Sequence, residues 1–289
     1  MNKQVVRNAS TATFIVFALN GLVFASWAAR IPAVTRILGL TAGQMGLLLL
    51  TIAVGSVMAL PMAGSVVARL GTANTVRAGG FTAAFGGLVI SAALAMGSVP
   101  LTAVGLFFFG IGVGLWDVSQ NIEGADVERH LGRTVMPQFH AGFSGGAFIG
   151  ALLGAGLSAL NVSMPGHLLA IVVLVVVAMV IVPRYFLPDT HVEAAKSDAV
   201  KNGRSAWTER RTLLIGLVVL GAALTEGAAN DWIAKATVDG LGATESAGAI
   251  MFAVFVASMT LFRFFGGKFI DTYGPVSYTH LTLPTNREV

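Results

Sequence analysis

Two pairs of an acid and an amide are the residues of this sequence best suited to chemistry. Asp117 and Asn121 are four residues apart, and so are Glu226 and Asn230. In an α-helix this spacing puts both side chains of a pair on one face. An ionisable group at the centre of a bilayer costs about 2.5 kcal/mol or more and is by default a functional candidate. Each pair could carry a proton or bind a polar solute. The alternative for Asp117 is a structural salt bridge with an arginine of a neighbouring helix.

Four further side chains could contribute to binding. Trp27 and Arg30 are one helical turn apart, so an indole could stack on a sugar ring while a guanidinium binds hydroxyls or a carboxylate. The alternative is a tryptophan of the interfacial aromatic belt beside an arginine that snorkels to the surface. Asn20 is a candidate deeper in the same helix. His140 could carry a proton or hydrogen-bond a substrate, although a single histidine is a poor metal site.

The sequence argues against several other functions. It has no nucleophile–base pair, no metal-ligand spacing and no phosphate-binding loop, so we expect neither an enzyme nor a bound metal or cofactor. It has no cysteine, which excludes disulfides and thiolate sites within these residues. No stripe of basic residues interleaved with aromatics is present, so nucleic acid is not an expected partner.

The elements that must position these residues are membrane helices. Hydrophobic residues make up 55% of the 289 residues, charged residues only 11%, and the mean hydropathy is +0.79. A soluble domain carries about 25% charged residues, so this chain is expected to lie in a lipid bilayer. Small residues allow helices to approach closely there, and the glycines between residues 142 and 156 predict such a packing surface.

Intervals without charged residues give the number of helices. A helix needs about 20 apolar residues to cross the hydrocarbon core. The two longest intervals, 78–116 and 134–183, each contain a turn-forming segment and therefore two spans. The expected spans, to within a few residues, are 11–34, 43–67, 78–97, 101–122, 137–160, 165–187, 212–236 and 246–268. The fold class is an all-α membrane protein.

The positive charges predict an orientation. With a cytoplasmic N-terminus, the inside segments hold fourteen Lys and Arg residues and the outside segments hold three, Arg30, Arg36 and Lys235. Cytoplasmic loops carry the excess of Lys and Arg, so we expect the N-terminus inside. The charged residues of segment 123–133 then lie at the cytoplasmic end of the fourth span. We expect them to form a gating or structural ion-pair network.

A polar stretch and an internal repeat divide the chain. Residues 188–211 are rich in charged and small residues, which is typical of a cytoplasmic linker. Residues 27–30 (WAAR) match 232–235 (WIAK) at an offset of 205, and 64–71 match 267–274 at an offset of 203. Both matches fall at the same point of the same helix pair. We expect a complete six-helix bundle in 1–187 and the first two helices of its parallel repeat in 212–274, an architecture of transporters.

The repeated segment 64–71 and its second copy, 267–274, resemble the G-x-x-x-D-R-x-G loop of the major facilitator superfamily. The first copy contains Gly64, Arg69 and Gly71, with Arg77 further on and Ala68 at the aspartate position, and the second copy contains Gly267, Asp271 and Gly274. The resemblance implies a major facilitator fold of two six-helix bundles. It also implies that these loops take part in gating and that the substrate moves by alternating access.

Within that superfamily the chain resembles the MosC-like carriers, which are related to the fucose–proton symporters. The matching segments are 117–121 (DVSQN), 140–146 (HAGFSGG, with His140 in place of glutamine) and 226–232 (EGAANDW), whereas Ala28 stands where the symporters have an acid. The resemblance implies a monomeric secondary transporter of the bacterial inner membrane for a sugar- or cyclitol-like solute, with proton coupling through Asp117 or Glu226. An exporter of drugs or metabolites and a non-transporting membrane sensor are the alternatives.

The last segment, 275–289 (PVSYTHLTLPTNREV), is polar, contains no span and resembles no part of the superfamily. A carrier of this superfamily has twelve helices, and the sequence accounts for about eight. We therefore expect a truncated chain with an artefactual tail after the eighth helix. A genuine eight-helix protein is the alternative.

Overall fold

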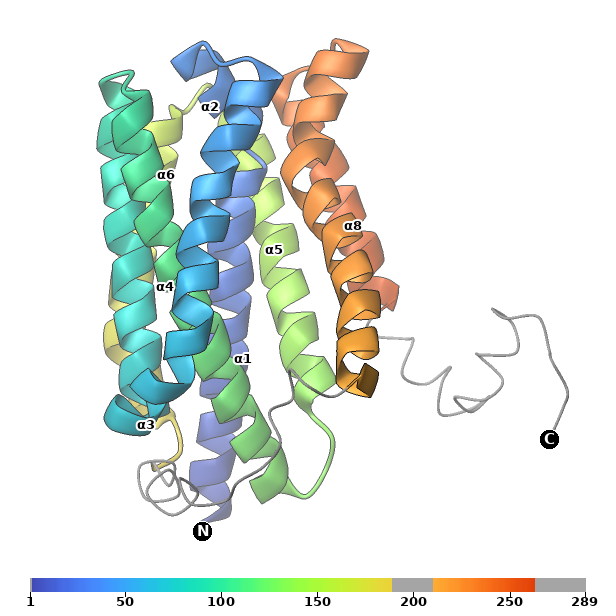
Figure 1. Ribbon diagram of the computed structural model, residues 1–289. Helices are drawn as coiled ribbons and strands as arrows, with labels where there is room; N and C mark the ends of the chain where they lie inside the picture. Colours follow the sequence, from blue (N-terminus) through green and yellow to red (C-terminus); the bar gives the residue numbers. More distant parts are fainter. Residues whose placement is uncertain (1, 189–209, 263–289) are drawn as a thin grey trace, which may run out of the picture.

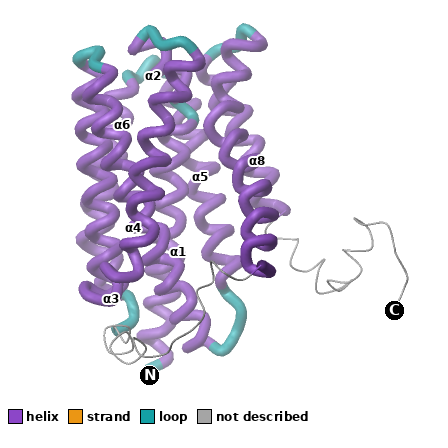
Figure 2. The backbone as a smooth tube through the Cα atoms, in the orientation of Figure 1, coloured by secondary structure: helices purple, strands orange, loops and turns teal. Residues whose placement is uncertain are grey.

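The computed structural model describes residues 2–188 and 210–262, and every regular element in these two segments is a helix. The first segment contains α1 (Lys3–Ala28), α2 (Ile31–Leu38), α3 (Ala42–Ala95), α4 (Val99–Leu131), α5 (Met136–Ala159), α6 (Met164–Ile181) and the 3₁₀ turn η1 (Val182–Tyr185). The second segment contains α8 (Arg210–Leu241) and a helix over Glu245–Phe262. The helices run along one common direction and the described loops lie at the two ends of the bundle (Figures 1 and 2).

The described residues contain seven helices long and apolar enough to cross a membrane. One of them, α3, has 54 residues and a non-helical Gly71 with φ 80° and ψ 167° inside it. Because about 20 residues cross a bilayer, α3 contains two spans, which turn back on each other at Gly71. Figure 1 shows its two halves side by side, joined at the lower end of the bundle near the N-terminus. The eight expected spans are therefore present in the described segments, the last of them as far as Phe262. The linker expected over 188–211 lies almost wholly outside the described residues.

Several boundaries differ from the expected spans; the first helix, for example, begins at Lys3 instead of residue 11. The helix expected over 11–34 breaks at Arg30, because α2 starts anew with Pro32 in its first turn. The fourth span continues to Leu131 instead of residue 122, since its polar end remains helical beyond the apolar stretch. The sixth ends at Ile181 instead of residue 187, because the 3₁₀ turn η1 follows from Val182 with Pro183 as its second residue.

Close contacts between small residues hold the first bundle together. A Cβ atom added at Gly146 of α5 would lie 1.8 Å from the Ala18 carbonyl oxygen of α1, and one at Gly110 of α4 would lie 2.2 Å from the Ile52 carbonyl oxygen of α3. The backbones therefore approach as closely as glycine permits. The expected glycine surface of α5 is confirmed in part: Gly142, Gly146, Gly150 and Gly154 face α1, whereas Gly145 and Gly156 face open space.

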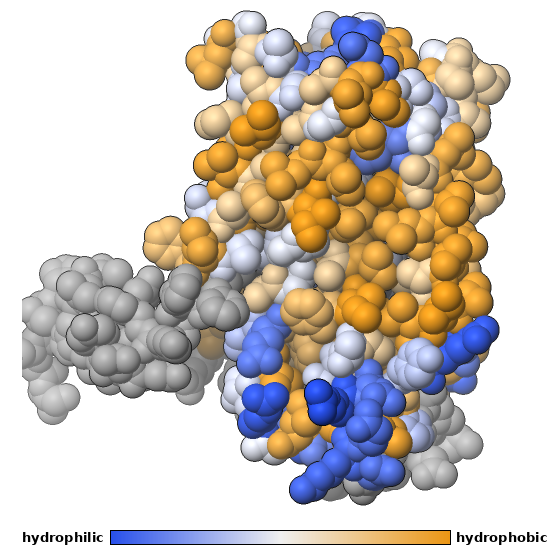
Figure 3. All heavy atoms as spheres, turned by 180° about the vertical axis from the view of Figure 1, so that it is seen from behind, coloured by the Kyte–Doolittle hydropathy of each residue, from blue (hydrophilic) through white to orange (hydrophobic). Residues whose placement is uncertain are grey.

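On the surface of the described segments, apolar and hydrophilic side chains are distributed as a bilayer requires. Large apolar side chains such as Leu47 and Val173 are 67% and 63% exposed. In Figure 3 apolar residues cover the middle of the molecule and hydrophilic residues lie at its upper and lower ends. This pattern agrees with a bundle whose sides contact lipid tails and whose ends contact water.

The two described segments contact each other in the upper half of the molecule. Alanines of α1 and α5 pack against Ala249, Phe252 and Val256 of the last described helix, in one buried cluster. The Ser246 hydroxyl donates a hydrogen bond of 3.1 Å to the Ala155 carbonyl oxygen. In the lower half of α8, by contrast, residues 213–225 are all exposed. The two segments are thus joined at the upper end. The lower end, where α8 is exposed in the described segments, is called the open side below.

Candidate functional site

The Asp117 side chain belongs to a polar cluster on α4. The Gln120 amide donates a hydrogen bond of 3.0 Å to the Asp117 carboxylate. The Asn121 amide donates one of 2.8 Å to the Asp117 backbone carbonyl, so Asn121 is turned toward its own helix. Asp117 and Asn121 are half-buried, whereas Gln120 is fully buried and its side-chain oxygen accepts no hydrogen bond within the described segments. Gln120 was missed by the sequence reasoning, although it is a third polar residue in the same apolar stretch.

The structure brings His140 to this cluster. His140, near the start of α5, lies close enough to Asp117 for their charges to interact. Its ring packs edge-on against Phe17 of α1, with ring centroids 5.3 Å apart, and the residue is exposed. No arginine in the described segments forms an ion pair with Asp117, so the alternative of a structural salt bridge finds no partner there. Three helices therefore contribute to one polar, accessible location.

The second acid–amide pair lies in the middle of α8. Glu226 and Asn230 are both half-buried, and so is the adjacent Asp231. Below this level the helix is exposed, and above it Ala234 and Lys235 are buried against the rest of the molecule. The pair is therefore located where α8 leaves the contact between the two segments. Lys235 pairs with Asp239 at 2.5 Å.

The structure separates Trp27 from Arg30. Trp27 is 2% exposed and packs in the apolar core of the first bundle, where its indole N–H has no acceptor among the described residues. Arg30 is 3% exposed but lines a pocket at the upper end. Neither side chain lies at the lipid-facing surface that an aromatic belt and a snorkelling arginine require. Asn20 is completely buried, and both ends of its amide lack a partner within the described segments.

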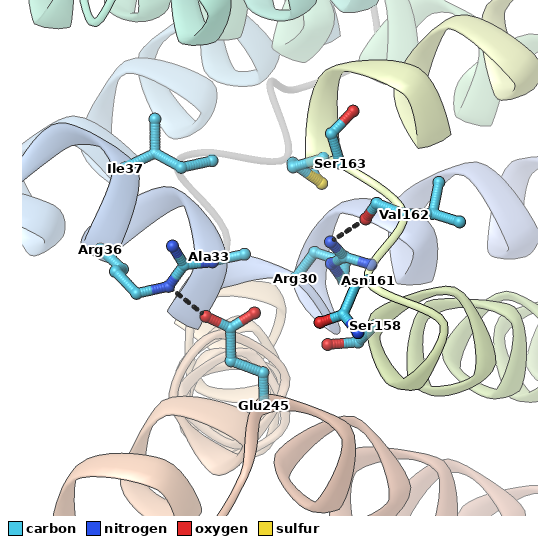
Figure 4. Close-up of a pocket in the computed structure, with 10 residues that line it drawn as sticks. Arg30, Ala33, Arg36, Ile37, Ser158, Asn161, Val162, Ser163 and Glu245 are labelled. Carbon is cyan, nitrogen blue, oxygen red and sulfur yellow. Dashed lines mark hydrogen bonds and ion pairs between the residues drawn. The ribbon is translucent and has the colours of Figure 1, made fainter.

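The pocket beside Arg30 has a volume of about 250 Å³. It is lined by Arg30, Ala33, Arg36, Ile37, Ser158, Asn161, Val162, Ser163, Met164 and Glu245 (Figure 4). Its walls come from the α1–α2 junction, the α5–α6 turn and the start of the Glu245–Phe262 helix. It lies at the opposite end of the bundle from the open side described above. Of its charged residues, the sequence reasoning proposed only Arg30 as a binding residue.

The first copy of the repeated loop lies at the lower end. Gly64 and Arg69 are exposed on α3, Gly71 makes the turn, and the Arg77 guanidinium donates a hydrogen bond of 2.8 Å to Asn74. The buried Glu123 carboxylate of α4 accepts a hydrogen bond from Thr72, just after that turn. The corresponding residues of the second copy, Gly267, Asp271 and Gly274, lie outside the described residues.

The charged segment 123–133 is in part structural. Glu123 also accepts a hydrogen bond of 2.7 Å from the Leu187 backbone N–H. The Glu128 carboxylate accepts hydrogen bonds from the backbone N–H groups of Val135 and Met136 at the start of α5. Arg129 pairs with Asp126 one turn before it. These contacts fasten the α4–α5 turn and the chain after η1.

Comparisons with known proteins agree with this architecture. The chain matches the Major Facilitator Superfamily over residues 9–285. It is 31% identical over 273 residues to an uncharacterised transporter of Sinorhizobium fredii, covering 92% of this chain and 69% of that protein. It is 29% identical to an uncharacterised MFS-type transporter of Yersinia pestis, covering 91% of this chain and 66% of that protein. The membrane protein MosC of Rhizobium meliloti is 26% identical, with 91% of this chain and 62% of that protein covered.

A solved structure has the same fold. The crystal structure of the nucleoside transporter NupG superposes with a TM-score of 0.62 at 16% sequence identity, covering 95% of this chain and 69% of that chain. The chain thus spans about two thirds of the length of these proteins. The family match extends to residue 285 and so includes most of segment 275–289, which the sequence reasoning had placed outside the superfamily.

Proposed function

Because this chain belongs to the Major Facilitator Superfamily, we propose that it moves a small polar organic solute, sugar- or cyclitol-like, across the bacterial inner membrane by alternating access. Transport of the solute is coupled to the movement of protons in the same direction, as in a symporter. The proposal includes a monomeric carrier with its N-terminus in the cytoplasm, because the lower end carries most of the Lys and Arg residues of the described segments. In that orientation the open side of the structure faces the cytoplasm.

The observation that carries this proposal is the Asp117 cluster. A half-buried carboxylate, two side-chain amides and a histidine come from α4 and α5 and meet beside Phe17 of α1. Amides and carboxylates are the groups that bind sugar hydroxyls by hydrogen bonds. An acid inside a membrane bundle is also the usual proton carrier of transporters.

Glu226 and Asn230 support the same function from the second segment. They are an acid–amide pair of the second segment, and they lie at the level where α8 leaves its contact with the first bundle. In alternating access the two bundles rock around a site that lies between them, so both can supply groups that bind the solute. We therefore assign Glu226 to proton or solute binding opposite the Asp117 cluster, with Asn20 as a buried amide of the first bundle.

Transport into vesicles tests the proposal. The purified chain is reconstituted into liposomes and offered a panel of labelled monosaccharides and cyclitols, including L-fucose and myo-inositol, with and without an imposed pH gradient. Accumulation of one of them that depends on the gradient is expected. The double variant Asp117→Asn, Glu226→Gln is expected to lose accumulation driven by the gradient but to retain exchange of labelled for unlabelled solute.

A control is Lys3→Gln, which removes an exposed charge at the start of α1, away from both acid–amide pairs. It should accumulate solute as the unmodified chain does. Uptake that ignores the gradient, or a double variant as active as the unmodified chain, would refute proton coupling through these acids. If solute instead moved only out of the vesicles, toward the side of lower pH, the chain would be identified as an exporter.

A further inference from the structure

The pocket at the upper end contains a buried cation whose hydrogen-bonding capacity is not used. The Arg30 guanidinium donates one hydrogen bond of 2.9 Å, from Nη2 to the Val162 carbonyl oxygen. Its Nε and Nη1 atoms are buried and have no partner within the described segments. A buried polar group without a partner costs about 1–3 kcal/mol, and more when it is charged. Such a group is kept where a ligand supplies the missing acceptors.

The same pocket already shows which acceptor fits. Arg36 of α2 pairs with Glu245 through Nε and Oε1 at 2.7 Å, and Figure 4 shows this pair on the other side of the pocket from Arg30. The Glu245 carboxylate is also close enough to Arg30 for their charges to attract. A carboxylate is therefore the acceptor that Arg36 binds in this pocket, and it also attracts Arg30.

The charge of the pocket is unbalanced. Its lining residues include two arginines and a single acid, Glu245, which leaves one formal positive charge. The remaining polar lining, from Ser158, Asn161 and Ser163, consists of hydroxyl and amide groups. These groups can hydrogen-bond the hydroxyls of a ligand, whereas a guanidinium binds a carboxylate with two parallel hydrogen bonds.

We propose that this pocket binds a small hydroxylated carboxylate, whose carboxylate group is held by Arg30 and competes with Glu245 for Arg36. The volume of about 250 Å³ suits a ligand of monosaccharide size. This location is on the opposite end of the molecule from the Asp117 cluster, so the proposal does not depend on the transport function proposed above.

The competition has a mechanical consequence. Arg36 and Glu245 are 209 residues apart and belong to the two segments that meet at the upper end. When a ligand carboxylate takes the place of Glu245 on Arg36, this ion pair between the segments opens. A carboxylate that enters from the upper side therefore weakens the closure on that side.

Binding measurements on the purified chain in detergent test the proposal. The probes are sodium D-glucuronate and D-glucose, which share a ring and differ in the carboxylate, titrated by calorimetry at constant ionic strength in sodium chloride. D-glucuronate is expected to bind and D-glucose is not. Arg30→Gln is expected to weaken D-glucuronate binding at least about tenfold, because a charge-assisted hydrogen bond is lost. Equal binding of both probes, or none of D-glucuronate, overturns the proposal.

A second variant keeps the test decisive if Arg30→Gln fails to fold. Glu245→Gln removes the competing carboxylate from a half-buried position, so D-glucuronate should bind about tenfold more tightly than to the unmodified chain. Unchanged or weaker binding overturns the proposal, since it means that Glu245 does not compete. Lys3→Gln, which removes an exposed charge at the start of α1, should leave D-glucuronate binding as it is; an equal loss of binding in that variant also overturns the proposal, since it means that the effect of Arg30→Gln comes from net charge alone.

Discussion

The Thr72 hydroxyl donates a hydrogen bond of 2.7 Å to the Glu123 carboxylate, and both residues are 1% exposed. Thr72 directly follows the Gly71 turn of α3, and Glu123 lies near the lower end of α4. The other oxygen of Glu123 accepts the Leu187 backbone N–H. A single buried carboxylate therefore fastens three parts of the first bundle at its lower end, beside the repeated loop in which Ala68 occupies the aspartate position.

Replacement of Glu123 should destabilise the bundle. Glu123→Ala removes a buried acceptor from the Thr72 hydroxyl and the Leu187 N–H, and loss of such a hydrogen-bond partner costs about 1–3 kcal/mol. Glu123→Gln retains one acceptor oxygen and should cost less. The measurement is the thermal unfolding midpoint of the purified protein in detergent. The control is Arg133→Gln, which removes an exposed charge of the same region and should leave the midpoint unchanged. A Glu123→Ala midpoint equal to that of the unmodified chain would contradict this role.

Neighbouring glycines of α5 should respond differently to the same substitution. A Cβ atom at Gly146 would lie 1.8 Å from the Ala18 carbonyl oxygen, whereas one at Gly145 meets nothing within 4 Å. Gly146→Ala should therefore separate α1 from α5 and cost about 1–3 kcal/mol, as overpacking does. Gly145→Ala should be neutral or slightly stabilising, since alanine favours the helix. Unfolding midpoints of the two variants, compared side by side, check this; equal midpoints would show that α1 and α5 do not pack through Gly146.

The sequence predicts the membrane spans better than it predicts where helices break or which distant residues meet. The spans follow from long apolar intervals, because only a helix satisfies its backbone within a bilayer. The break at Arg30 was missed even though Pro32 favours a new helix start there, since hydropathy continues across it. The extension of α4 to Leu131 was missed for the opposite reason: polar residues end an apolar interval but do not end a helix.

Among the site residues, those related by local spacing could be predicted and those that meet only through packing could not. The pairs Asp117–Asn121 and Glu226–Asn230 could be found because their spacing matches the helical period. The pocket residues Arg36 and Glu245 could not be paired from the sequence, as they are 209 residues apart and meet only through the packing of the two segments. Trp27 next to Arg30 suggested a shared role, yet the break between α1 and α2 leaves the indole in the core and the guanidinium in the pocket.

The closure of the upper end can be tested by cross-linking. The chain contains no cysteine, so introduced cysteines are the only thiols. Ser246 and Ala155 touch across the two segments, with 3.1 Å between the hydroxyl and the carbonyl oxygen. The variant Ala155→Cys, Ser246→Cys should form a disulfide under mild oxidation, and the oxidised protein should lose solute exchange until it is reduced. Ile149→Cys with Ser246→Cys is the control, because Ile149 is exposed on another face of α5. Efficient cross-linking of the control pair, or none of the test pair, would show that the segments do not meet in this way.

Cysteine labelling also tests the orientation. Met96 is 73% exposed at the turn between α3 and α4, and Thr134 is exposed at the opposite end, in the turn between α4 and α5. The turn at Thr134 follows Arg129 and Arg133, whose charges favour the cytoplasmic side. In intact cells a membrane-impermeant maleimide should label Met96→Cys and leave Thr134→Cys unlabelled, whereas both should react after permeabilisation. The reverse pattern would place the N-terminus outside, and the open side of the structure would then face away from the cytoplasm.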